Sequence, residues 1–132
     1  MPIFGKLTPN LLVTDVSRSL AFYVDVLGFA RGITVPEAPP FMFGSVTSGQ
    51  VEIFFNEATN AVKEYPELAD RPIGATETMF IEVEGIDAFY AQLEGRVAFV
   101  HPLVTQWYGM KEFAIADPDG YLITFAERAE AA

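Results

Sequence analysis

The chain has 132 residues, the size of one ordinary domain, and 51% of them are hydrophobic, which is ample for a sizeable core. Eighteen acidic residues against eight basic ones give a formal net charge of −10, which repels phosphate backbones and argues against nucleic acid as a partner. The absence of cysteine excludes disulfides, thiolate metal ligands and a cysteine nucleophile, and no apolar run approaches the ~18 residues needed to cross a membrane. We therefore expect a cytoplasmic protein without a membrane partner, whose acidity either attracts cationic ligands or serves solubility alone.

The first half of the chain predicts the element order βαβββ. Residues 6–14 alternate as a strand, and the helix that follows begins at Asp15 or Ser17 as N-cap and ends at Gly28. Its hydrophobic side chains recur at the spacing i, i+3, i+4, i+7: Leu20, Tyr23, Val24 and Leu27. Three further runs are typical of strands: residues 31–35, 41–47 and 51–56.

A polar stretch separates this half from the next. Residues 57–77 carry Pro66, Pro72 and Gly74, as loops do, although residues 61–68 are compatible with a helical turn.

The second half repeats the order of the first. Its strongest signal is a hairpin over residues 110–125, whose tight turn is Asp117-Pro118-Asp119-Gly120. A strand at residues 78–83, a helix ended by Gly95 and a short strand at residues 97–100 precede the hairpin. The helix has the same hydrophobic spacing as the first one: Ile86, Phe89, Tyr90 and Leu93.

The two halves are also similar in sequence, because Thr8 and Thr78, like Val13 and Val83, lie 70 residues apart. We predict an α+β fold of two tandem βαβββ modules, with the helices on the outer face of a cup-shaped mixed β-sheet. The boundaries expected within a single domain are residues 5–57 for the first module, 58–76 for the linker and 77–128 for the second module. Four aromatic residues are assigned to the core: Phe22, Phe29, Phe89 and Phe125.

A series of short motifs runs through both halves: Thr8-Pro9-Asn10-Leu11, Val13-Thr14-Asp15, Ser19-Leu20-Ala21-Phe22-Tyr23, Leu27-Gly28-Phe29, Tyr108-Gly109, Lys111-Glu112-Phe113 and Asp117-Pro118-Asp119-Gly120. Together and in this order they resemble the vicinal oxygen chelate superfamily, which includes glyoxalases, bleomycin-resistance proteins and extradiol dioxygenases. The resemblance covers both modules and is weakest in the linker.

Metal-using members of that superfamily carry His, Gln or Glu at four strand positions, which the resemblance assigns here to Thr8, Glu52, Thr78 and Thr124. Three hydroxyls and one carboxylate do not suit Zn²⁺, Ni²⁺ or Fe²⁺, which prefer imidazole or several carboxylates. The single histidine, His101, lies outside these positions. We therefore expect no metal and no other cofactor.

The orientation of Glu52 depends on the alignment of its strand. In one alignment Glu52 faces the cup with Phe54 and Asn56, and in the other a one-residue slip puts Ile53 there and turns Glu52 away. We favour the first, because it leaves hydrophobic side chains to pack beneath the helix.

Within the superfamily the likeness is greatest to the bleomycin-resistance proteins, which bind a bulky cationic drug as acidic homodimers without metal. The resemblance implies a homodimeric protein that sequesters a cationic or aromatic small molecule in a cup at the dimer interface. Aromatic walls are expected from Phe41, Phe43, Trp107 and Tyr108, charge from Glu52 and Glu112, hydrogen bonds from Thr8, Asn10, Thr78 and Thr124, and further lining from Phe54 and Met110. Phe41 and Phe43 share one strand face in this scheme, and either could instead be an ordinary core residue.

Two other functions remain open. A lone carboxylate in an apolar cup has the properties of a general base, so Glu52 could serve a lyase or isomerase of the same superfamily, although no second acid or base is evident. The third alternative is a degenerate relative that binds another protein through its dimer surface. We rank the binding protein first and expect no catalytic residue.

Overall fold

The structure of the chain is a computed structural model that describes residues 2–74 and 76–129. The chain divides into two compact units, Met1–Arg71 and Pro72–Ala132, and each contains a four-stranded mixed sheet with a helix packed on it. Both units have the element order βαβββ, so the predicted α+β fold of two such modules is confirmed. None of the helices in the described part of the chain is long and apolar enough to cross a membrane.

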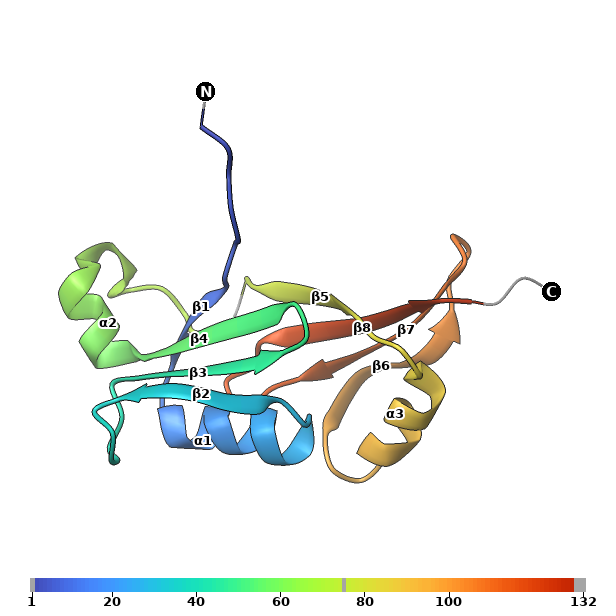
Figure 1. Cartoon of the computed structure of the whole chain (residues 1–132), viewed down its shortest axis with the longest axis horizontal. Helices are drawn as coiled ribbons and strands as arrows, with labels where there is room; N and C mark the ends of the chain where they lie inside the picture. Colours follow the sequence, from blue (N-terminus) through green and yellow to red (C-terminus); the bar gives the residue numbers. More distant parts are fainter. Residues whose placement is uncertain (1, 75, 130–132) are drawn as a thin grey trace. The chain divides into compact units, whose positions relative to one another are not determined.

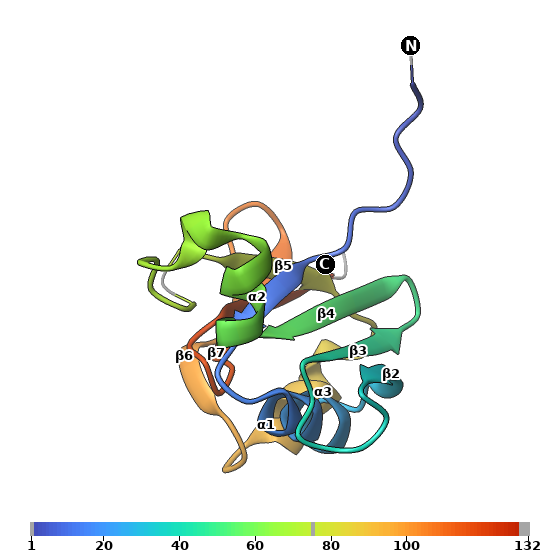
Figure 2. The same ribbon diagram turned by 90° about the vertical axis from the view of Figure 1, so that its left-hand side faces the viewer.

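The sheet of the first unit has the strand order β1-β4-β3-β2, with β1 parallel to β4 and the other pairs antiparallel. Its strands are β1 (Asn10–Val13), β2 (Ala30–Val35), β3 (Phe43–Ser48) and β4 (Val51–Glu57). The helix α1 (Val16–Ala21) continues through the π-helical turn η1 (Phe22–Val26) and lies along one face of this sheet (Figure 1, Figure 2). The approach is close because Gly44 lies beneath α1, where a Cβ atom would come within 2.9 Å of Val16 Cγ1.

The core of the first unit lies between α1 and the sheet. Its fully buried side chains include Val13, Tyr23, Val46, Ile53 and Phe55. Phe29 is buried as predicted and contacts Tyr23, with ring centroids 5.8 Å apart. Phe22 is only half-buried, because it follows α1 on the flank of the helix rather than on the stripe that faces the sheet. The assignment of Phe22 to the core was therefore wrong.

The second unit has the same topology, with the strand order β5-β8-β7-β6. Its elements are β5 (Thr78–Glu82), α3 (Ile86–Leu93), β6 (Ala98–Thr105), β7 (Met110–Ala116) and β8 (Leu122–Arg128). The core centres on Phe113 of β7, whose ring contacts those of Phe89, Tyr90, Phe99 and Phe125 at centroid distances of 5.1–6.0 Å. Phe125 is buried as predicted, and Phe89, also assigned to the core, packs on the rings of Phe113 and Phe125 from the half-buried edge of the cluster.

The predicted hairpin between β7 and β8 is present. Its turn closes through a hydrogen bond from the Gly120 N–H to the Asp117 carbonyl at 3.0 Å, with Gly120 at φ 88°. The Asp117 carboxylate accepts hydrogen bonds from the Asp119 and Tyr121 N–H groups at 2.9 and 3.0 Å. Burial, followed by the charges of Asp117 and Asp119, raises the pKa of Tyr121 to about 12. The turn thus fixes a buried, neutral phenol at the start of β8.

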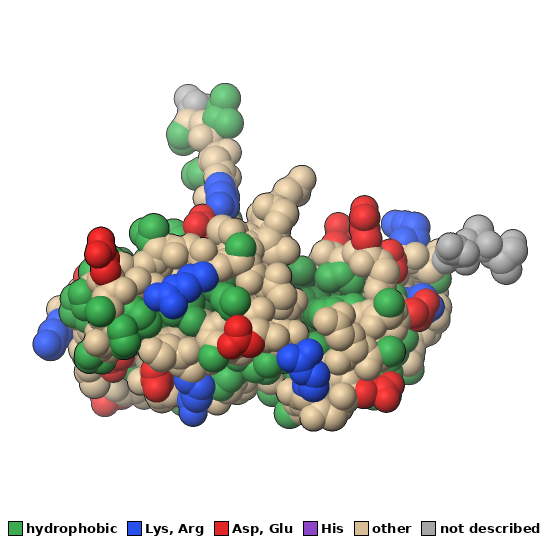
Figure 3. All heavy atoms as spheres, turned by 60° about the horizontal axis from the view of Figure 1, so that its bottom comes forward, with side chains coloured by type: hydrophobic (Ala, Val, Ile, Leu, Met, Phe, Trp, Pro, Cys, Tyr) green, Lys and Arg blue, Asp and Glu red, His purple; other side chains and the backbone are tan. Residues whose placement is uncertain are grey.

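Several element boundaries differ from the prediction. The first strand begins at Asn10 rather than at residue 6, since Pro9 has no N–H group to donate to a ladder. Residues 2–7 precede it as an exposed segment that projects from the surface with its hydrophobic side chains in view (Figure 3).

β6 is longer than predicted and passes through Pro102, which an edge strand tolerates. The linker contains the helix α2 (Ala58–Glu64) and the 3-10 turn η2 (Pro66–Leu68).

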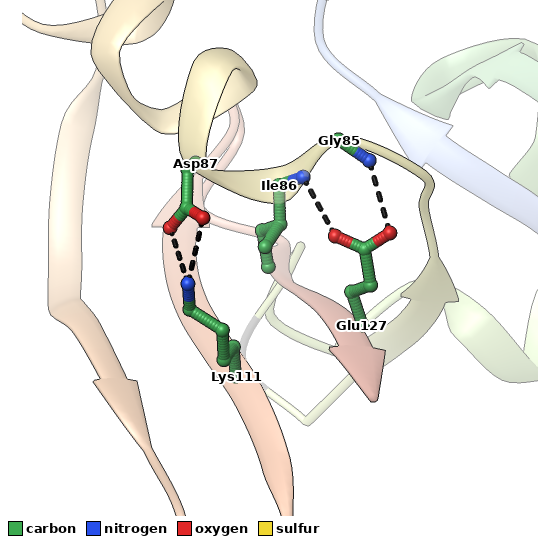
Figure 4. A network of polar contacts seen from close by, with 5 residues as sticks. All are labelled: Gly85, Ile86, Asp87, Lys111 and Glu127. Atoms are coloured by element: carbon green, nitrogen blue, oxygen red, sulfur yellow. Dashed lines mark hydrogen bonds and ion pairs between the residues drawn. The ribbon is translucent and has the colours of Figure 1, made fainter. Parts of the chain in front are cut away.

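Carboxylates cap the helices of both units. Asp15, one of the two predicted N-caps, caps α1 and accepts a hydrogen bond from the N–H of Ser17, the other candidate, at 2.9 Å. Glu57 caps α2, and Glu127, 70 residues later, reaches from β8 to the Gly85 and Ile86 N–H groups of α3 at 3.0 Å each (Figure 4). The two hydrogen bonds lower the pKa of Glu127 below its ordinary value of 4.5.

Replacing Glu127 with glutamine is expected to lower the melting temperature at pH 7, because α3 loses a charged N-terminal cap. The pKa of Glu127 is lower in the folded state than in the unfolded state, so this stabilisation is complete above pH ~4.5 and is lost as the pH falls through the folded value. Melting curves between pH 3 and 7 should therefore show a difference between wild type and variant that shrinks in acid. Glu94→Gln, at the other end of α3, is the matched control and should not lower the melting temperature. Equal melting temperatures for wild type and Glu127→Gln at pH 7 would contradict this role.

Candidate functional site

Each sheet has a face turned away from α1 or α3, which we call its distal face. In β4, Ile53 and Phe55 are fully buried on the α1 side, so alternation places Glu52, Phe54 and Asn56 on the distal face. The structure thus has the first of the two alignments considered for Glu52. The register of the sheet adds Asn10, opposite Phe54, to the same face.

Polar and aromatic contacts link the distal-face residues of the first unit. The Phe43 and Phe54 rings meet edge to face, with centroids 5.1 Å apart. The Asn56 side-chain amide donates a hydrogen bond to the Asn10 side chain. The Lys6 Nζ atom lies 2.7 Å from Glu52 Oε1, so this carboxylate already holds a cation of its own chain.

Phe41 lies apart from this group. It precedes β3, is 9% exposed, and lies under the guanidinium of Arg31, which is 5.1 Å from its ring centroid. It lines a hollow of about 360 Å³ together with Leu20 and Val24, on the α1 side of the sheet. The expectation that Phe41 and Phe43 share a strand face was wrong, because alternation applies only within the strand and Phe41 lies outside it.

On the distal face of the second unit the central residue is Glu112 of β7. Phe113 and Phe125 face α3, so Glu112 lies on the opposite side, where it pairs with Ala126 of β8 and Val104 of β6. The register places other predicted residues on the same face: Thr78 opposite Leu122, Thr124 opposite Phe80 and Ala114, and Met110 opposite Arg128.

A tight loop before β7 brings Tyr108 to Glu112 and sets Trp107 against Tyr108. Gly109, at φ 89°, turns the chain, and the Tyr108 hydroxyl donates a hydrogen bond of 2.6 Å to Glu112 Oε2. This hydrogen bond raises the pKa of Tyr108. Trp107 is 93% exposed and meets the Tyr108 ring edge to face at 5.2 Å. Glu112 itself is 8% exposed, so a nearly buried carboxylate lies beside an exposed aromatic pair.

Met110 lines a second hollow, of about 480 Å³, in the second unit. The residues around it are Glu82, Val83, Glu84, Met110, Ala126, Glu127 and Arg128. Ala126 is also the pairing partner of Glu112, although the Glu112 side chain does not itself line the hollow. Sequence reasoning did not identify the three glutamates around this hollow, Glu82, Glu84 and Glu127. It also missed the contact of Lys6 with Glu52, since no local pattern connects two residues that lie 46 positions apart.

The side chains at the four positions assigned to a metal are poorly suited to one. Thr8 lies ahead of β1, Glu52 contacts Lys6, and Thr78 and Thr124 pair with hydrophobic residues of neighbouring strands. Hydroxyls are poor ligands for Zn²⁺, Ni²⁺ or Fe²⁺, so the donors present do not fit these ions. Within residues 2–74 and 76–129, no group of three His, Cys, Asp or Glu side chains is placed to hold an ion.

Comparisons with known proteins by family model and by sequence point to the same superfamily. The model of a family described as "Glyoxalase/Bleomycin resistance protein/Dioxygenase superfamily" matches residues 6–125. A curated protein of Geobacillus stearothermophilus named "Bleomycin resistance protein" is 32% identical over 130 residues, which cover 91% of this chain and 94% of that protein.

Solved structures share the fold. The bleomycin-binding protein of bleomycin-producing Streptomyces verticillus, complexed with copper(II)-bleomycin, has a TM-score of 0.64 and 24% identity, covering 99% of this chain and 100% of its own. TnmS3, an antibiotic binding protein from Streptomyces sp. CB03234, has a TM-score of 0.73 and 22% identity, covering 98% of this chain and 99% of its own.

Proposed function

Because the chain belongs to the glyoxalase/bleomycin resistance protein/dioxygenase superfamily, we propose that it binds a bulky cationic or aromatic small molecule without metal and acts by sequestering it. The observation that carries this proposal is the 32% identity, over nearly the full length of both chains, to a protein named for bleomycin resistance. Two structural neighbours that bind antibiotics have the same fold and support the same class of ligand.

The side chains of the distal faces are suited to such a ligand. Aromatic rings offer stacking surfaces, and carboxylates attract a cation. The first unit has Phe43 and Phe54 beside Glu52, and the second has Trp107 and Tyr108 beside Glu112. The net charge of −10 also favours the approach of cations over anions.

We further propose that the protein acts as a homodimer in the cytoplasm, with the ligand held where two copies meet. Exposed hydrophobic side chains are available for a subunit contact, among them Ile33, Met42, Phe80 and Val104. The enzyme alternative finds less support, because the Lys6 ammonium contacts the Glu52 oxygen that a general base would use to accept a proton.

Calorimetric titration of the purified protein with metal-free bleomycin tests the proposal. We expect saturable binding, a higher melting temperature in the presence of the drug, and a dimeric mass by analytical ultracentrifugation. Trp107→Ala should weaken binding roughly tenfold, because an exposed stacking surface is lost without disturbing the core.

Phe4→Ala serves as the control for Trp107→Ala, since Phe4 is an equally exposed aromatic residue in the N-terminal segment. That variant should bind as the wild type does. A folded protein that binds neither bleomycin nor other cationic aromatic compounds would refute the proposed function.

A further inference from the structure

The two distal-face carboxylates named in the proposed function, Glu52 and Glu112, differ in their contact partners. Glu52 contacts the Lys6 ammonium at 2.7 Å, so a ligand cation arriving there must displace a cation already present. Among the described residues, Glu112 accepts a hydrogen bond from the neutral Tyr108 hydroxyl alone, at 2.6 Å. Within the described residues no lysine or arginine forms an ion pair with Glu112.

The surroundings of Glu112 strengthen its attraction for a cation relative to that of Glu52. Its neighbours across the strands are Ala126 and Val104, and the carboxylate is 8% exposed. A charge with little water around it interacts more strongly with a partner than an exposed charge does. Leaving such a carboxylate without a cation is costly, so binding a cation there is favoured.

The basic residues closest in the strands form no ion pair with Glu112 among the described residues, although Arg128 lies on the same distal face. Lys111 lies on the α3 side of β7, where its ammonium contacts both Asp87 oxygens at 2.6 and 2.7 Å. Arg128 is exposed at the end of β8, opposite Met110. Neither of them neutralises Glu112.

We propose that Glu112 is the residue that binds the cationic group of the ligand, that Tyr108 is a positioning residue that orients this carboxylate, and that Glu52 is not part of the cation site. This inference rests on the proposed function and makes it specific. Tyr108 fixes Oε2 and leaves Oε1 to the ligand, while Trp107, in contact with the Tyr108 ring, provides an aromatic surface next to the charge. The ligand class is therefore an aromatic group linked to an ammonium or guanidinium group.

The test uses the full-length chain and a matched pair of probes, 4-phenylbutylammonium and the neutral alcohol 4-phenylbutanol, with binding followed by NMR chemical shifts. The wild type should prefer the ammonium, and Glu112→Gln should reduce that preference by about tenfold or more, because a charge-assisted hydrogen bond is lost. Glu52→Gln, at the competing carboxylate, should change the preference less than threefold. The matched control is Glu94→Gln, at an exposed carboxylate that follows α3 and belongs to neither distal face, and it should leave the preference unchanged.

Tyr108→Phe keeps the ring and removes the hydroxyl. If the hydroxyl orients Glu112, this variant should lose part of the preference for the ammonium and keep its affinity for the alcohol. A merely structural role would weaken both probes alike. Melting temperatures near that of the wild type would show that the variants are folded, and signals of residues 107–112 should shift on binding.

The outcomes separate the two proposals. If the wild type prefers the ammonium through Glu112 but ignores bleomycin, the cation site stands and sequestration of such drugs fails. If the wild type binds bleomycin but shows no preference for the ammonium, or if Glu52→Gln abolishes the preference and Glu112→Gln does not, the present inference is overturned.

Discussion

Replacing Phe113 with alanine is expected to lower the free energy of unfolding by about 3–5 kcal/mol, the usual loss for a buried phenylalanine. Phe113 is fully buried and contacts four other rings, from α3, β6 and β8. Removing it leaves a cavity bounded by three elements of the second unit, which cannot all move inward. Chemical denaturation followed by circular dichroism measures this loss.

Phe80→Ala provides the control in the same sheet. Phe80 is 58% exposed on β5 and lies outside the aromatic cluster, so its loss should cost less than about 1 kcal/mol. Comparable losses for the two variants would mean that the Phe113 cluster is not the core of the second unit.

Replacing Gly74 with alanine is the second substitution with a large expected effect. Gly74 has φ +77°, and a Cβ atom there would lie 2.4 Å from the Asp119 carbonyl oxygen in the β7–β8 turn. The strained backbone costs roughly 1–2 kcal/mol, and the collision with another main-chain segment adds about 1–3 kcal/mol. We expect a large fall in the free energy of unfolding, measured by denaturant titration.

Gly95→Ala separates the two contributions. Gly95 has nearly the same φ, +78°, but a Cβ atom there would meet nothing within 4 Å. The free energy of unfolding of this variant should fall only by the cost of the backbone conformation, ~1–2 kcal/mol. If Gly74→Ala were no more harmful than Gly95→Ala, the contact between residue 74 and the hairpin turn would be unimportant to stability.

Much of the fold follows from patterns that are local in the sequence. The Asp-Pro-Asp-Gly turn determines the hairpin because its residues favour the required dihedral angles. The orientation of Glu52 also follows from alternation, since Ile53 and Phe55 must be covered by α1. Such features depend on neighbours a few residues away, which a single sequence displays.

The features that sequence reasoning missed depend on partners far along the chain. Glu127 caps α3 from 41 residues away, where Gly85 offers no side chain for a local cap. Lys6 meets Glu52 across 46 residues. Phe41 departs from the predicted face because the chain turns before β3 begins, and periodicity carries no information about where a strand starts.

The exposed N-terminal segment has a consequence for the behaviour of the protein in solution. Ile3, Phe4 and Leu7 are 87–97% exposed, so each molecule presents hydrophobic surface through which it can associate with other molecules. At neutral pH the net charge of −10 keeps molecules apart, but this repulsion vanishes near the isoelectric point of about 4.3. Salt weakens it as well, because ~0.1 M salt screens charges beyond roughly 10 Å. Colloidal stability should therefore be lowest in mildly acidic, salt-containing buffers, even where each molecule remains folded.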